Sequence, residues 1–366
     1  MGDKRRARKA KQARRDLRRA RKRDPVERSV RRLIRDAMKG GHPLGLLTLA
    51  SVLINLVKSR SDNCVSWLLR TRTHETTALL AVAAELLVDE PSLQQRCRRE
   101  LAARDRHLAR WISALPDVDV YRAVHRTDVL GDFDELWMGA RIGDRHEITL
   151  IVRVGHVALP GVRDAVALGA PIDEIVARGA AKWPDDVFVD MSLADARAWT
   201  EDALAGYAFR RESDRVPHYR ALVKWWVNAM PEGGRERSLT MYSKDAERVC
   251  DEFFATELAA PFTHERHPEL LVDLVMGFQN PLRWSETRVR FALRCPDLEE
   301  GYHDYPLEVA LDAPDPLRAF IPYAHARVGI REELTLDTIA MVDALRSGYK
   351  RGLLEQVTGW DLDDAV

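Results

Sequence analysis

Three consecutive segments of the chain alternate in hydropathy with a period of two, and this pattern limits the fold more than any other feature. They cover residues 118–128, 135–142 and 147–154, and a loop of Gly, Asp and Arg at 143–145 joins the last two. Such alternation is typical of β-strands that bury one face, and a three-residue loop with glycine is typical of a hairpin. The pattern predicts a three-stranded antiparallel sheet.

Charged residues fix the register of the predicted hairpin. If paired positions sum to 288, Arg141 lies opposite Glu147 and Glu135 lies opposite Arg153, which places two pairs of opposite charge on one face. The even-numbered positions of both strands are then apolar and share the other face. We expect this even-numbered face to lie against the core.

The same register brings a histidine to a group of carboxylates at the far end of the hairpin. His156 follows the third strand and falls opposite Asp132, in a turn that also contains Asp128 and Asp134. Such a group can bind a divalent metal or act in general acid–base catalysis, because carboxylates raise the pKa of a nearby imidazole. The candidate catalytic residues are His156, Asp132 and Asp128, and the candidate metal ligands are these three and Asp134. His125 lies three residues before Asp128, so we expect it on the face opposite Asp128, as a packed or surface residue.

The rest of the chain is patterned as helices. Apolar residues recur at spacings of three and four before residue 115 and after residue 171, and Pro, Gly and Asn-Pro sequences mark the joints. We predict a predominantly helical α+β fold, with a small antiparallel three-stranded sheet between two helical regions. The expected divisions are a basic helical or disordered extension (1–25), a helical region (26–115), a β region (116–170) and a second helical region (171–366).

Residues 4–23 form a basic segment on a chain whose formal net charge is zero. They contain 13 Lys and Arg and one acid, Asp16, so the remainder of the chain carries a net charge of −12. Four alanines and Leu17 recur along the segment at helical spacing, but such a seam buries too little surface to hold a helix by packing alone. We expect an anionic partner to order it.

The charge of this segment is suited to phosphate binding. Lys and Arg bind nucleic-acid phosphates without reading sequence, and no recognition motif accompanies the charge. We predict a cytoplasmic accessory factor that binds RNA or DNA phosphates, alone or in a ribonucleoprotein, and that needs no cofactor. The predicted contact residues are Arg5, Arg6, Arg8, Lys9, Lys11, Arg14, Arg15, Arg18, Arg19, Arg21, Lys22 and Arg23.

Two other functions fit the same sequence. The group around His156 would make the protein an acid–base or metal-dependent enzyme, with a divalent metal as its cofactor. The basic segment can instead bind an acidic protein surface, including the acidic surface of its own chain near the C-terminus.

Several classes of protein lack their signatures in this sequence. There is no GxSxG, P-loop, GxGxxG or HExxH motif, and the four cysteines are too far apart for a CxxC or zinc site, which favours reduced thiols and a cytoplasmic protein. The apolar run at 44–57 is too short to span a bilayer and lies too far along the chain for a signal peptide. We expect it to be a buried helix.

Two stretches of the chain resemble a family of uncharacterised proteins from high-GC bacteria. They are VYRAVHRTDVLGDFDELWMGARIGDRHEITLIVRVGH at 120–156 and NPLRWSETRVRFAL at 280–293. The resemblance covers about two thirds of the chain and includes the three-strand segment and an Arg-Trp-Ser turn before a helix. It implies no assigned activity. This chain has Gly155 and His156 where the family pattern has an Asp-His pair, and Asp128 where the pattern has a histidine.

Overall fold

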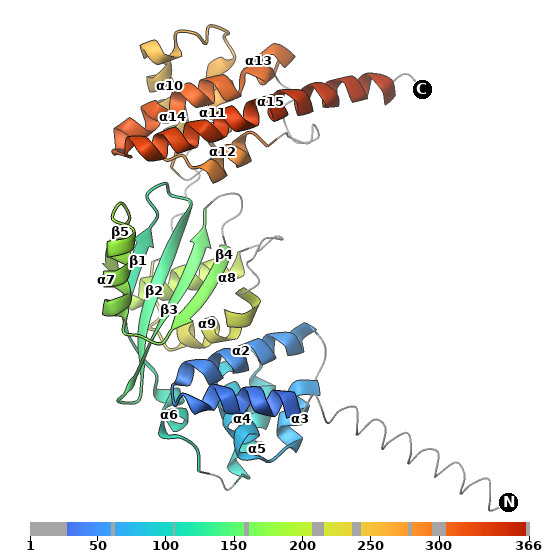
Figure 1. Ribbon diagram of the computed structural model, residues 1–366, viewed down its shortest axis with the longest axis vertical. Coiled ribbons are helices and arrows are strands. Elements are labelled where there is room, and N and C mark those ends of the chain that lie inside the picture. Colours follow the sequence, from blue (N-terminus) through green and yellow to red (C-terminus); the bar gives the residue numbers. More distant parts are fainter. Residues whose placement is uncertain are drawn as a thin grey trace, which may run out of the picture.

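The computed structural model describes most of the chain, and the basic segment lies outside the described residues. These are residues 28–59, 63–104, 107–156, 161–206, 216–235, 243–276, 280–294 and 305–363. Figure 1 shows three parts along the longest axis, which we name the N-terminal helical unit (28–117), the sheet unit (119–228) and the C-terminal helical unit (243–363). The fold is α+β and mostly helical, as the sequence predicts.

The N-terminal helical unit contains the apolar helix that the sequence predicts. Its elements are a helix over residues 28–39, α2 (Pro43–Ser59), α3 (Asn63–Arg70), α4 (His74–Leu86), α5 (Pro91–Ala102), α6 (Arg110–Ser113) and the 3-10 turn η1 (Leu115–Asp117). The apolar run at 44–57 forms α2, on which Leu46, Leu47 and Ala50 are fully buried. Within the described residues, no helix combines the length and the hydropathy needed to cross a membrane.

The sheet unit contains one antiparallel sheet with the strand order β4-β3-β2-β1-β5. Its strands are β1 (Asp119–Thr127), β2 (Phe133–Ile142), β3 (His146–Gly155), β4 (Gly161–Leu168) and β5 (Val187–Met191). The predicted hairpin register is confirmed, since Arg141 pairs with Glu147 and Glu135 pairs with Arg153. Both pairs also form ion pairs, at 3.0 and 2.7 Å. The even-numbered residues at 136–142 on β2 and at 148–154 on β3 are buried, as expected.

The predicted count of three strands is wrong, because the sheet has five. β4 has a register irregularity opposite Arg153 and Val154, and this interrupts the alternation that marks a strand in the sequence. β5 has five residues, lies at an edge of the sheet and leaves Val187 and Val189 about half exposed, in a region expected to be helical. Pairing with β3 and β1, rather than a local pattern, makes these segments strands.

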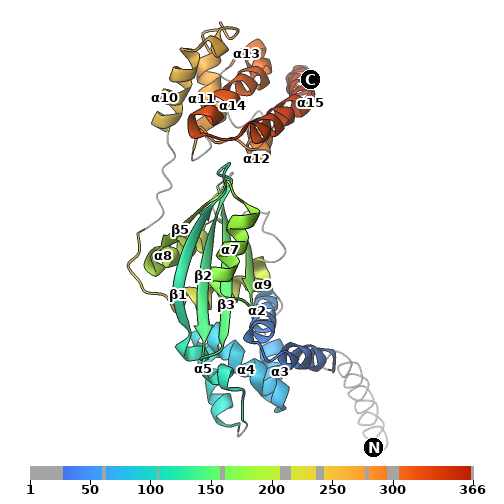
Figure 2. The ribbon, with the colours of Figure 1, turned by 60° about the vertical axis from the view of Figure 1, so that its left-hand side comes forward.

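Helices cover both faces of the sheet (Figures 1 and 2). α7 (Ile172–Lys182) packs on the odd-numbered face of β2 and β3, where Trp137 and Ile151 are buried. Gly179 permits this contact, because a Cβ atom there would lie 2.5 Å from the Trp137 ring. α8 (Leu193–Ala205) and α9 (Val216–Asn228) cover the even-numbered face, and the Ser192 side chain caps the start of α8.

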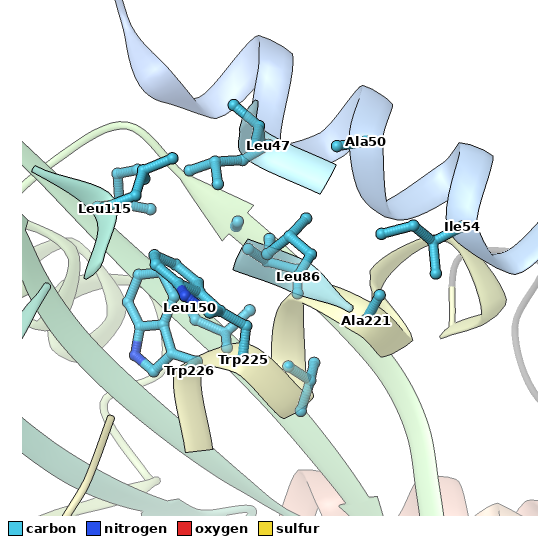
Figure 3. Packing of buried hydrophobic residues seen from close by; sticks show 14 of the residues in the cluster. Leu47, Ala50, Ile54, Leu86, Leu115, Leu150, Ala221, Trp225 and Trp226 are labelled. Carbon is cyan, nitrogen blue, oxygen red and sulfur yellow. The ribbon is translucent and has the colours of Figure 1, made fainter. Parts of the chain in front are cut away.

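One hydrophobic core joins the N-terminal helical unit to the sheet unit. Figure 3 shows Leu47 and Leu86 from the helices, Leu150 from β3, and Trp225 and Trp226 from α9 in the same cluster. These two units therefore form a single body.

The C-terminal helical unit has a core of its own. Its elements are α10 (Ser243–Phe254), the 3-10 turn η2 (Glu257–Ala259), α11 (His267–Met276), α12 (Glu286–Ala292), α13 (Leu307–Asp312), α14 (Pro314–Val328) and α15 (Glu332–Asp363). Trp284, Phe253 and Phe320 are fully buried in it. Because its core is separate, its position depends on the contacts that it makes with the sheet unit.

Candidate functional site

Two histidines share one aspartate at the end of the sheet where residues 128–132 connect β1 to β2. The Oδ1 atom of Asp134 lies 2.8 Å from Nε2 of His125, and its Oδ2 atom lies 2.9 Å from Nε2 of His156. All three side chains are on the even-numbered face of β2 and β3. We name these residues the histidine–aspartate cluster.

Burial and the two imidazoles shift the pKa of Asp134 in opposite directions. Asp134 is 8% exposed and His156 is 7% exposed, and burial by itself raises the pKa of a carboxyl. Hydrogen bonds from His125 and His156 outweigh burial and hold the pKa of Asp134 well below its usual range. The ionised carboxylate therefore orients both rings, and the Trp199 ring packs edge-on against His125 at 5.1 Å.

His125 belongs to this cluster, although the sequence predicts a packed or surface residue apart from the candidate site. Alternation along the first strand separates its side chain from that of Asp128, but the pairing between strands decides which face it joins. His125 pairs with Leu136, so the odd-numbered residues at this end of β1 share a face with the even-numbered residues of β2. A register shift between Val120 and Arg122 contributes to this offset, and the sequence does not reveal it.

The carboxylates of Asp132 and Asp128, which the sequence also predicts for this site, bind other groups. The His156 backbone N–H donates to the Asp132 carbonyl oxygen at 2.9 Å, as the predicted register requires. The carboxylate of Asp132, however, accepts from Ser285 Oγ at 2.7 Å, and that of Asp128 accepts from the Asp132 N–H at 3.2 Å. Burial raises the pKa of Asp128. Across the part of the chain that the structure describes, no three His, Cys, Asp or Glu side chains are placed to share a metal ion.

Residues 128–132 contact the C-terminal helical unit, which the sequence gives no reason to expect. Arg288 is 1% exposed and donates from Nη2 to the Gly131 carbonyl oxygen, while its Nε atom lies 3.3 Å from Asp132 Oδ1. Arg283 Nη1 donates to the Val129 carbonyl oxygen at 2.6 Å. We name these contacts, with Ser285 to Asp132, the interdomain contact. It joins residues 129–132 to residues 283–288.

Arg288 also forms hydrogen bonds within the C-terminal helical unit. Nη1 of Arg288 donates to the carbonyl oxygens of Asn280 at 2.9 Å and of Arg283 at 2.5 Å. Burial lowers the pKa of Arg288 to about 10, which still leaves it charged at neutral pH. In the same unit, the backbone N–H of Trp284 lies 3.1 Å from Nε2 of His325. Burial lowers the pKa of His325 to about 4. The imidazole is therefore neutral, and its tautomer decides whether Nε2 accepts from the Trp284 backbone N–H or donates to the Trp284 carbonyl oxygen, which also lies 3.1 Å away.

A second buried charge network lies on the odd-numbered face of the sheet. Arg126 donates to Glu135 at 2.5 Å and to Asp186 at 2.7 Å, and its guanidinium stacks on the Trp183 ring at 3.9 Å. Arg153 binds the other carboxylate oxygen of Glu135 at 2.7 Å. The network borders a hollow of about 420 Å³ beside α7. Its charges satisfy one another, so it is suited to positioning the strands.

The sequence predicted only part of this network. The Glu135–Arg153 pair follows from the hairpin register, but Arg126 reaches it through the β1–β2 pairing. Asp186 comes immediately before β5, a strand that the sequence pattern does not predict.

The twelve predicted nucleic-acid contacts, from Arg5 to Arg23, lie outside the described residues.

Comparison with protein-family models, with curated proteins and with solved structures finds no match to this chain. The function is therefore argued from charge and geometry.

Replacing Asp134 with asparagine is expected to lower the free energy of unfolding by about 2–4 kcal/mol at pH 7, because the buried imidazole of His156 and the half-buried imidazole of His125 lose a charged acceptor. The folded-state pKa of Asp134 is depressed, so its stabilisation is complete above the unfolded pKa of about 4. The difference between wild type and variant should shrink as the pH falls below that value. Urea denaturation at several pH values measures it.

The matched control is Asp144→Asn, in the exposed hairpin loop, which should change the stability by less than about 0.5 kcal/mol. If Asp134→Asn behaves like this control at pH 7, the histidine–aspartate cluster does not stabilise the fold.

Proposed function

We propose that the protein is a cytoplasmic, nucleic-acid-associated accessory factor that binds phosphates without reading sequence, through the positively charged N-terminal part of the chain. The observation that carries this proposal is the separation of charge along the molecule. Residues 1–115 contain 28 Lys and Arg and 12 Asp and Glu, whereas residues 243–366 contain 13 Lys and Arg and 24 Asp and Glu. The formal net charge of zero therefore combines a positive N-terminal part with a negative C-terminal part.

The described residues keep the positive N-terminal helical unit and the acidic C-terminal helical unit apart in space. The N-terminal helical unit lies at one end of the longest axis and the C-terminal helical unit at the other, with the sheet unit between them (Figure 1). A polyanion is attracted to the first end and repelled by the second, so it should meet the protein in a preferred orientation. This arrangement supports phosphate binding at the N-terminal end.

Deletion of residues 1–24 is expected to weaken binding to duplex DNA or RNA at least a hundredfold. The deletion removes all 13 Lys and Arg of the basic segment and leaves every described residue in place. Loss of about six or more phosphate contacts has an effect of this size at low salt. An electrophoretic mobility assay at 50 mM salt measures it.

An unchanged melting temperature is the control that the remaining chain is folded. Equal binding by both chains, or no binding by the full chain, contradicts the proposal. Recovery of only an acidic protein in a nuclease-treated pull-down would instead favour the acidic-surface alternative.

A second candidate function is favoured by the histidine–aspartate cluster. Asp134 contacts Nε2 of two imidazoles and fixes both rings, which suits general acid–base chemistry. It ranks second because Asp134 and His156 are more than nine-tenths buried, so a substrate has to displace the groups that cover them. Thermal stabilisation by Zn²⁺ that is abolished in His156→Ala would support a metal-dependent form of this function.

A further inference from the structure

A groove on the N-terminal helical unit is lined mainly by arginine. It has a volume of about 650 Å³ and lies between α3 and α5. Its lining residues are Ser66, Leu69, Arg70, Arg96, Arg99 and Glu100. The groove therefore combines three guanidinium groups with a single carboxylate.

The three arginines of the groove form no ion pair with any described residue, unlike their neighbours. Within the described residues, no carboxylate lies within 4 Å of Arg70, Arg96 or Arg99, and all three are exposed. By contrast, Arg98 on the same helix binds Glu85 at 3.1 Å. We name Arg70, Arg96 and Arg99 the groove arginines.

The one carboxylate of the groove is already neutralised by other side chains. Glu100 accepts from Arg72 at 2.9 Å and from Arg104 at 3.0 Å. Hydrogen bonds from Arg72 and then Arg104 lower the pKa of Glu100, so it stays ionised and bound to them. Its charge therefore does not neutralise the groove arginines, and they remain available to an anionic ligand.

The positions of the groove arginines suit a row of anions. Arg96 and Arg99 are three residues apart, so they lie on one side of α5, one turn from each other. Arg70 is in the last turn of α3, on the opposite wall. A guanidinium group binds phosphate oxygens through two parallel hydrogen bonds, and the phosphates of a nucleic-acid backbone repeat along its length.

We infer that this groove is a second phosphate-binding site, at which Arg70, Arg96 and Arg99 hold the backbone of the nucleic acid that the basic segment also binds. The inference rests on the proposed function and assigns part of it to the folded body. Residues 26–115 contain 15 Lys and Arg and 9 Asp and Glu, so the groove belongs to a unit that is positive even without the basic segment. The basic segment precedes this unit directly in the chain.

The test compares two full-length triple variants with the wild type. The first, Arg70→Gln, Arg96→Gln and Arg99→Gln, removes the groove arginines. The second, Arg290→Gln, Arg294→Gln and Arg351→Gln, removes three exposed arginines from the acidic C-terminal helical unit. Both variants lose the same charge, so only the location differs.

Fluorescence anisotropy with a labelled 30-base-pair duplex, in separate DNA and RNA arms, measures the affinity between 50 and 200 mM salt. We expect the groove variant to bind at least tenfold more weakly than the wild type at 50 mM. Its slope of log affinity against log salt should be shallower by about 2.7, the effect of three phosphate contacts. The control variant should match the wild type in both quantities.

Three outcomes are separable. If the wild type binds with a steep salt slope but the groove variant binds equally well, the inference fails while the proposed function stands. If polyglutamate displaces the duplex as well as unlabelled duplex does, and this displacement depends on the groove arginines, the site is one for acidic protein and the inference fails. If the wild type binds neither nucleic acid, the proposed function itself fails.

Discussion

Replacing Arg288 with methionine is expected to destabilise the protein by about 3–5 kcal/mol. Arg288 is almost fully buried and donates to the carbonyl oxygens of Gly131, Asn280 and Arg283. Methionine fills a similar volume but leaves these acceptors and the Asp132 carboxylate without a donor at this position, and removing one partner of a buried ion pair has a cost of this size. A factor of about a thousand in the unfolding equilibrium follows.

Calorimetry of the full chain measures this effect, and the expected transition should also change in form. Because the C-terminal helical unit has its own core, loss of the interdomain contact should let it unfold in a separate step from the single body formed by the other two units. Arg290→Met is the control, since Arg290 lies two residues along α12 and is exposed. A loss below about 1 kcal/mol in Arg288→Met, with one undivided transition, would mean that the interdomain contact does not hold the units together.

The hairpin could be predicted from the sequence because its determinants are local. Alternation defines β2 and β3, a short loop joins them, and two charge pairs select one register from its neighbours. This register also placed His156 opposite Asp132, where the backbone hydrogen bond is found. The edge strand β4 is not predicted because a register irregularity interrupts its alternation, and β5 is not predicted because it depends on pairing with the distant β1.

The side-chain partners in the candidate site could not be predicted by the same reasoning. Whether His125 shares a face with His156 depends on how β1 pairs with β2, and a bulge changes that pairing. The contact of Arg288 with Gly131 joins residues 157 positions apart. No local pattern contains such a contact, so only the folded chain reveals it.

The groove arginines could not be predicted from the sequence for a different reason. Arginine outnumbers lysine 47 to 10 in this chain, so individual arginines carry little information about function. The structure separates arginines that bind carboxylates, such as Arg72 and Arg104, from those that do not. This difference in pairing directs attention to Arg70, Arg96 and Arg99.

The affinity of the full chain for duplex nucleic acid is expected to fall roughly a thousandfold or more between 50 and 200 mM salt. Each phosphate that a Lys or Arg neutralises releases a condensed counterion, so contacts by about six to eleven charges give a slope of log affinity against log salt of about −5 to −10. The source of this effect is the positive N-terminal part of the chain, since residues 116–366 carry 29 Lys and Arg and 45 Asp and Glu. Changes in base sequence should have little effect.

The most direct test of phosphate binding at the N-terminal end is therefore the salt dependence of binding by the wild-type chain. Anisotropy titrations of one labelled duplex at four or more salt concentrations between 50 and 200 mM give the slope. A slope of about −5 or steeper, equal for two unrelated base sequences, is the predicted result. No binding at 50 mM, or a slope shallower than about −2, would contradict the proposed function.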